Sequence, residues 1–141
     1  MSQKSSQNPF VGLWALDPFQ SKYEFGLPAQ SATYQIQPER DGLTFTAKWV
    51  AADAQSFLSL SFHGIPDGEE YAYQNPAIAD TLATTRVDAQ TLDTTIKKNG
   101  QVMAHARRVL SADGQTMTIT QSGMNDKGAW FDNVSVYIKQ S

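Results

Sequence analysis

Two glycine-containing turns constrain the fold of this chain more than any other feature. Asn99-Gly100 and Asp113-Gly114 separate three strand-like runs between Leu92 and Ser122. Asn-Gly and Asp-Gly tolerate positive φ at the centre of a tight turn, and between alternating runs they are a strong signal for a β-hairpin. The stretch therefore predicts three consecutive antiparallel strands.

The turn lengths determine which side chains share a face, because side chains alternate along a strand. An even-numbered loop at Asp113-Gly114 places Arg108 on the same face as Leu110, Met117 and Ile119. That face is otherwise apolar and must be the buried one. The sequence thus predicts an arginine that points into the protein.

The Asn99-Gly100 turn allows two loop lengths. A two-residue loop would turn Leu92 to the solvent side, whereas a three-residue loop over residues 98–100 sets Ile96 against Val102 and Leu92 near Ala106. Because the second choice buries one consistent face, we expect the three-residue loop.

The rest of the chain continues the same pattern. Strand-like runs occur at residues 9–16, 32–38, 43–50, 56–63, 70–73, 80–87 and 129–139. Asp17-Pro18 resembles a helix start, so we allow at most one short helical turn near residues 17–22. We predict an all-β chain, a single antiparallel up-and-down β-barrel of about 8–10 strands over residues 9–141, after a disordered tail at residues 1–8. Closure would pair the first strand with the last.

Composition narrows the possible functions. The 141 residues carry a net charge of -3, which argues against nucleic acid as the main partner. No apolar run is long enough to span a membrane, and the polar N-terminus is no secretory signal. The absence of cysteine excludes disulfides, thiol catalysis and thiolate metal sites. Together these features predict a cytoplasmic protein.

Gly12-Leu13-Trp14, near the N-terminus and followed by a chain-long meander, resembles the G-x-W signature of the lipocalins. The chain is thus similar to the calycin superfamily, which includes lipocalins and fatty-acid-binding proteins. The pattern from Lys98 to Thr118 also resembles bacterial lipocalin-like proteins. The resemblance implies a ligand held inside a barrel.

The chain departs from these families at known positions. Lipocalins carry an arginine near the last strand that packs on the tryptophan, and here the last strand offers only Lys139. Fatty-acid-binding proteins use an R-x-Y clamp, which Tyr137-Ile138-Lys139 does not match. Residues 17–31 are too few for a helix-turn-helix lid. The resemblance therefore implies the fold and leaves the ligand open.

Arg108 is the main candidate for a binding residue. A buried charge is costly unless it is paired, so Arg108 either binds a ligand's carboxylate or phosphate or serves structurally, packing on Trp14 or pairing with an internal acid. Asp132 alternates with Trp130, Val134 and Val136, and an Arg108–Asp132 pair is one hypothesis. A bulge in the last strand would leave Asp132 exposed instead.

Other candidates complete the predicted ligand site. Tyr34, Trp49 and Phe62 fall on inward faces and could line a cavity, although they are equally plausible core residues. Arg86 shares the inward face near a turn and would either extend to solvent or add positive charge at the barrel mouth.

The remaining polar residues suggest neither catalysis nor a metal site. His63 and His105 both face outward by parity, and two histidines without cysteine make a poor metal set, although one histidine could ligate haem. Glu69 and Glu70 are adjacent and point opposite ways, as in a solvated turn. No nucleophile, P-loop or dinucleotide motif is present.

We therefore expect the chain to bind a small, mostly apolar ligand, with or without an anionic group, in the barrel interior. No cofactor, metal or catalytic residue is predicted. The alternatives are an isomerase- or cyclase-type enzyme that uses the same pocket with an Arg108–Asp132 pair, and an interaction module with a filled core. The expected partner is a small lipophile, with neither nucleic acid nor a membrane span.

Overall fold

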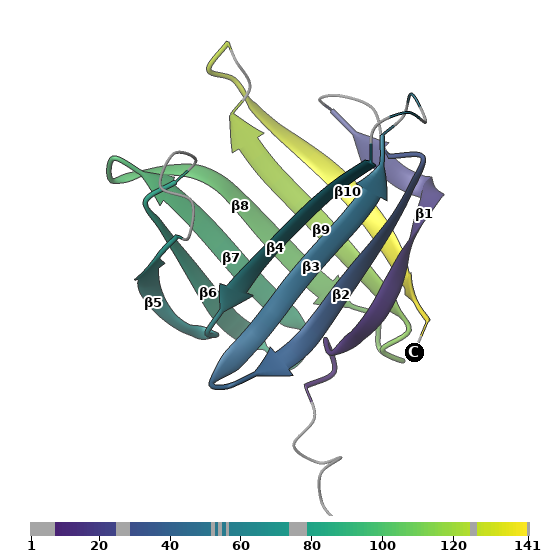
Figure 1. The fold of residues 1–141 in the computed structure, drawn as a ribbon, viewed down its shortest axis with the longest axis horizontal. Helices are drawn as coiled ribbons and strands as arrows, with labels where there is room; N and C mark the ends of the chain where they lie inside the picture. The colour runs from purple at the N-terminus through teal and green to yellow at the C-terminus, as the bar shows by residue number, and fades with distance from the viewer. Residues whose placement is uncertain are drawn as a thin grey trace, which may run out of the picture.

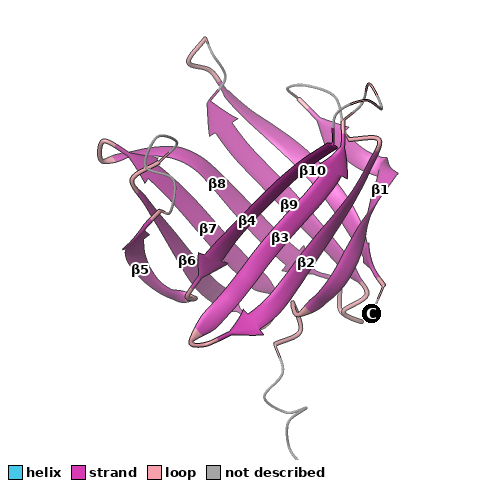
Figure 2. Cartoon of the chain, viewed as in Figure 1, coloured by secondary structure: helices cyan, strands magenta, loops and turns pink. Residues whose placement is uncertain are grey.

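The computed structural model describes residues 8–24, 29–51, 53, 55, 57–73, 79–124 and 127–140. These residues contain ten β-strands. Figure 2 shows strands and loops and no helix among them. The strands are β1 (Gly12–Tyr23), β2 (Ser31–Glu39), β3 (Gly42–Val50), β4 (Phe57–Gly64), β5 (Asp67–Ala72), β6 (Thr81–Asp88), β7 (Thr91–Lys98), β8 (Gln101–Leu110), β9 (Thr116–Met124) and β10 (Trp130–Lys139). The all-β prediction and the strand number are confirmed.

All ten strands form one curled antiparallel sheet with the order β4-β3-β2-β1-β10-β9-β8-β7-β6-β5 (Figure 1). The first strand pairs with the last, with Trp14 opposite Lys139, as closure of a meander requires. The two edges are β4 and β5, which follow each other in the sequence. Among the described residues no ladder joins these edges, so closure leaves one unpaired seam instead of removing every edge.

The Asn99-Gly100 turn differs from its prediction. Lys98 pairs directly with Gln101, so the loop has two residues, and φ is 53° at Asn99 and 76° at Gly100. Positive φ at both positions gives the primed turn geometry that suits strand twist. A β-bulge then shifts the register between Ile96 and Lys97, and Leu92 ends opposite Arg108. The bulge therefore produces the single buried face that we expected from a three-residue loop.

Residues 17–22 form no helical turn. They continue β1, whose register against β10 shifts between Asp17 and Lys22. The Asp17 carboxylate accepts a hydrogen bond from the Phe19 amide at 3.0 Å, and the Ser21 hydroxyl accepts one from the Val136 amide at 3.0 Å. Asp17 thus caps a local bulge and not a helix, because the neighbouring strand supplies partners for the backbone.

The core fills the end of the barrel at which β1 begins, which is the lower end in Figure 1. Trp14 is fully buried there and its indole Nε1 donates to the Phe10 carbonyl at 3.1 Å. Other members of this core are Ile36, Leu43, Phe45, Leu92, Leu110, Met117, Ile119 and Tyr137. The pairs Leu110–Met117 and Arg108–Ile119 confirm the even loop predicted at Asp113-Gly114.

Candidate functional site

Arg108 lies inside the sheet, as its position on β8 predicts, and only 1% of it is exposed. Its Nε donates to the Tyr34 hydroxyl at 3.1 Å and its Nη1 donates to Thr94 Oγ1 at 3.0 Å. The guanidinium carbon also lies 4.6 Å from the centroid of the Phe45 ring. Neutral hydroxyls and an aromatic face therefore hold the charge in place.

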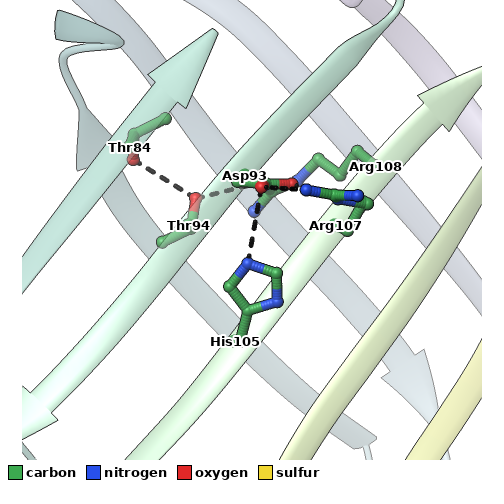
Figure 3. A network of polar contacts seen from close by, with 6 residues as sticks. All are labelled: Thr84, Asp93, Thr94, His105, Arg107 and Arg108. Atoms are coloured by element: carbon green, nitrogen blue, oxygen red, sulfur yellow. Dashed lines mark hydrogen bonds and ion pairs between the residues drawn. The ribbon is translucent and has the colours of Figure 1, made fainter. Parts of the chain in front are cut away.

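The polar contacts of Arg108 continue across two further strands. Thr94 on β7 lies 3.2 Å from the Thr84 hydroxyl on β6, and both threonines are buried (Figure 3). No carboxylate of the described residues lies within ion-pair distance of Arg108. The charge is thus solvated by hydroxyls but not neutralised.

Arg108 faces a cavity of ≈ 390 Å³ in the interior of the sheet. Small side chains, among them Ala32, Ala47 and Ala106, leave the space open. The other lining residues are Leu16, Tyr23, Ala29, Tyr34, Phe45, Trp49, Ala51, Leu60, Phe62, Thr94, Ile96, Ile119, Gln121, Ser135 and Tyr137. This volume is at the lower end of the range typical of small-molecule sites.

Two tyrosines add hydrogen-bond donors to the Arg108 end of the cavity. Tyr34 uses its hydroxyl oxygen to accept from Arg108, which leaves its O–H free to donate. Tyr137 packs edge-on against Tyr34 with ring centroids 5.6 Å apart, and its hydroxyl bonds to no described residue. Burial, and then the nearby Tyr23 and Tyr34, raise the pKa of Tyr137 well above its ordinary value. Tyr137 therefore stays neutral and able to donate.

Donors outnumber acceptors at this end of the cavity. Arg108 has five N–H groups, and two of its nitrogens each make one bond to a described residue. The free N–H groups of Arg108 and the hydroxyls of Tyr34 and Tyr137 are available to an acceptor in the cavity. An anionic group satisfies this set better than a neutral one.

Polar groups also occur on the wall formed by β1, β9 and β10. Tyr23 and Ser135 share a hydrogen bond of 2.9 Å between their hydroxyls, and the Gln121 amide lines the cavity beside them. The rest of the wall is mainly aromatic and aliphatic. The cavity therefore suits an amphiphile.

The structure brings four of the six predicted site residues together. Arg108, Tyr34, Trp49 and Phe62 all line the cavity. Tyr34 touches Arg108, and Phe62 stacks on Phe45 with centroids 4.8 Å apart.

Asp132 does not reach Arg108. It is exposed and accepts a hydrogen bond from the Ser122 hydroxyl at 2.5 Å. Asp132 pairs with Ser122 on β9. Gln121, the residue next to Ser122, lines the cavity, so Ser122 and its partner Asp132 face outward. On β10 the inward residues are thus Ser135 and Tyr137, the opposite parity from the prediction. The expected Arg108–Asp132 pair does not form.

Arg86 lies at the rim and not at the cavity. Its guanidinium donates to the backbone carbonyls of Asp88 at 3.2 Å and Ala89 at 3.3 Å, and the residue is exposed. This agrees with a side chain that extends to solvent beside the β6–β7 turn, one of the two placements that the sequence allowed.

Both histidines lie on the outer surface or at its edge, each near an aspartate. His105 lies 3.5 Å from Asp93 on the outer side, where Asp93 also forms an ion pair with Arg107 (Figure 3). His63 lies 3.5 Å from Asp41. Among the described residues, no three His, Cys, Asp or Glu side chains are grouped as a metal site would require.

Thr94 and Tyr137 belong to the site but were not among the predicted residues. Thr94 alternates with Leu92 and Ile96 on β7, so parity could have identified it as inward. Tyr137 could not be found in that way, because the inward face of β10 was assigned to Asp132 and its neighbours.

Solved structures with a similar fold are known. The chain is similar to the zebrafish ileal bile acid-binding protein in complex with cholic acid, with a TM-score of 0.56 and 15% identity over 94% of this chain and 99% of that one. It is also compared with lobster apocrustacyanin A1, at a TM-score of 0.41 and 14% identity over 99% of this chain and 64% of that one. The first likeness shows the fold alone, and the second is too distant to support an argument.

The sequence comparisons add no family. No protein-family model matches the chain, and no curated protein matches it. Among the described residues no helix is long and apolar enough to cross a membrane.

Proposed function

We propose that this chain binds a small amphiphile in its interior, with the anionic group of the ligand at Arg108. The observation that carries the proposal is a buried arginine that faces a cavity and has no carboxylate partner among the described residues. Desolvating such a charge costs roughly several kcal/mol, and neutral hydroxyls offset only part of that cost. A ligand carboxylate or phosphate would supply the missing counter-charge.

The surrounding donors favour an anion with at least two oxygens. One oxygen can accept from the free N–H groups of Arg108, while the hydroxyls of Tyr34 and Tyr137 donate to the same group. Charge-assisted hydrogen bonds of this kind are about twice as strong as neutral ones. The head group would therefore also satisfy the Tyr137 hydroxyl.

The apolar body of the ligand would extend along the cavity toward the open end of the sheet. Trp49, Leu60 and Ile96 line that part, and 43% of Leu60 remains exposed although it lies on the inward side of β4. Covering such surface contributes about 25 cal/mol per Å². The fold likeness agrees with this reading, since the zebrafish protein is a bile acid-binding protein.

A binding role is favoured over catalysis. The enzyme hypothesis relied on an Arg108–Asp132 pair, and Asp132 lies on the outer surface. The described residues that line the cavity include no histidine and no carboxylate, so they offer no general base of the usual kinds. A cytoplasmic location is part of this proposal, because the chain has no cysteine with which to form the disulfides common in small secreted proteins.

The test compares a long-chain carboxylic acid with the primary alcohol of the same chain length. Calorimetric titration of the wild-type chain should show the acid binding at least about tenfold more tightly than the alcohol, a difference of about 1.4 kcal/mol. Arg108→Met should abolish the preference for the acid and retain weak binding of both.

Arg107→Met is the matched control, because Arg107 is the next residue and lies on the outer face, paired with Asp93. It should bind the acid as the wild type does. If Arg108→Met keeps the acid preference, or if the wild type binds neither compound nor any other lipophilic acid, the proposal is wrong.

A further inference from the structure

A second, smaller cavity lies at the seam between β4 and β5. Its volume is ≈ 140 Å³, and it is separate from the larger cavity except that Phe62 lines both. Residues from β4, the β4–β5 turn, β5 and β6 form its walls. The cavity exists because the two sheet edges that meet here form no ladder among the described residues.

Close packing bounds this seam cavity at Gly64. A Cβ atom at Gly64 would lie 2.7 Å from Thr84 Oγ1 and 3.4 Å from Thr84 Cβ, so β4 meets β6 only because Gly64 has no side chain. Beside this contact the walls are formed by Phe62, Tyr73 and Leu82, and they enclose the space between the strands. The contact fixes one end of the cavity.

The walls combine aromatic and aliphatic side chains with the His63 imidazole and the hydroxyls of Tyr73 and Thr84. Tyr73 is 8% exposed, and its hydroxyl makes no hydrogen bond to any described residue. Thr84 is 1% exposed and shares one hydrogen bond with Thr94. The Tyr73 hydroxyl is therefore available to bond to a ligand that enters this cavity.

We propose that the seam cavity is a second binding site that takes a small one-ring phenol. An apolar cavity of about 150 Å³ is known to hold benzene, so the volume fits a single aromatic ring. Phe62, Tyr71 and Tyr73 provide rings against which it can pack, and Tyr73 and Thr84 add hydroxyl-bearing side chains to the lining, to which a phenolic O–H would bond.

The seam site does not depend on what the larger cavity binds. Its lining residues other than Phe62 are absent from the larger cavity, and Arg108 lines only the latter. The two sites can therefore be blocked one at a time by enlarging a side chain that lines only one of them. Leu82 lines the seam cavity and Ala47 lines the larger one.

The experiment titrates phenol into the wild-type chain and into Leu82→Trp and Ala47→Leu, and binding is followed by backbone amide NMR shifts. We expect saturable binding with shifts at residues of β4, β5 and β6. Leu82→Trp should weaken phenol binding at least about tenfold, while Ala47→Leu should leave it unchanged. The cavity of ≈ 140 Å³ beside Leu82 provides space for the larger ring.

Tyr73→Phe provides a second test that needs no change of cavity volume. It should weaken phenol binding several-fold and leave toluene binding unchanged, because only phenol can bond to the lost hydroxyl. Three results would each overturn the proposal: no saturable phenol binding to the wild type, loss of binding in Ala47→Leu with retention in Leu82→Trp, or equal binding in all variants.

Discussion

Lys139 Nζ lies 5.6 Å from the centroid of the Trp14 ring, and the two residues face each other in the β1–β10 ladder. The contact joins the first strand to the last at the closed end of the barrel. A lysine thus occupies the place on the tryptophan for which the lipocalin resemblance implies an arginine. The structure shows that the missing arginine does not leave Trp14 without a cation.

Lys139→Ala should destabilise the fold by about 0.5–1 kcal/mol, the usual size of a partly exposed cation–π contact. Lys139→Arg should retain most of the stability, because a guanidinium can also lie on an indole face. Urea unfolding followed by tryptophan fluorescence measures both. Lys48→Ala, at an exposed position of β3, serves as control and should lie within about 0.5 kcal/mol of the wild type. Equal losses in Lys139→Ala and Lys139→Arg would contradict a cation–π role.

Arg108→Met should leave the free protein as stable as the wild type or stabilise it by about 1–2 kcal/mol. An apolar side chain of similar length removes an unneutralised buried charge, and such replacements are often neutral or stabilising. The hydroxyls of Tyr34 and Thr94 lose one bond each, which offsets part of the gain. Thermal unfolding without ligand measures the difference. A loss of more than about 3 kcal/mol would mean that Arg108 is structural.

The ion pair between Asp93 and Arg107 predicts that the free energy of unfolding depends on pH. A bidentate pair, with N–O distances of 2.8 and 2.7 Å, holds the pKa of Asp93 below its usual value, with smaller effects from His105. A lowered folded-state pKa means that the stabilisation is complete above the unfolded value of about 3.9 and is lost as the pH falls through the folded value. Asp93→Asn should thus be less stable than the wild type at pH 6, and the two should converge below about pH 4.

Urea unfolding at a series of pH values from about 2.5 to 7 tests this pair. Arg107→Gln should show the same convergence as Asp93→Asn, and the double variant should add little to either. Strictly additive losses would show that the two side chains do not stabilise each other in solution.

Sequence reasoning succeeded where a turn fixed the parity of a strand. Asp113-Gly114 fixed β8 against β9, and Arg108, Leu110 and Met117 all lie on the inward face. It failed where the register depends on contacts far apart in the sequence. The bulge opposite Ile96 and the shift between Asp17 and Lys22 follow from the neighbouring strand, and alternation within one strand cannot reveal them.

The site residues could be predicted from the sequence only on strands with a clear alternation of polar and apolar side chains. Tyr34, Trp49 and Phe62 lie on cleanly alternating strands, and all three line the cavity. Asp132 was misplaced because Trp130, Val134 and Val136 make an apolar face that looks internal. Val136 is buried although it lies on the outer face. Its amide donates to the Ser21 hydroxyl in the β1 bulge, and this bulge covers that part of the outer surface.

Gly64 and Thr84 provide a test of the seam as a packed contact. Gly64→Ala places a methyl group 2.7 Å from Thr84 Oγ1, too close for any ordinary contact, so the strands must separate or Thr84 must move. The expected destabilisation is about 1–3 kcal/mol. In Gly64→Ala/Thr84→Ala the clashing oxygen is gone, and the contacts with Phe45 Cε1 at 3.2 Å and Thr84 Cβ at 3.4 Å remain. The double variant should therefore lose less than the two single variants together, with a coupling of about 1 kcal/mol in urea unfolding. Additive losses would mean that β4 and β6 do not touch at this point in solution.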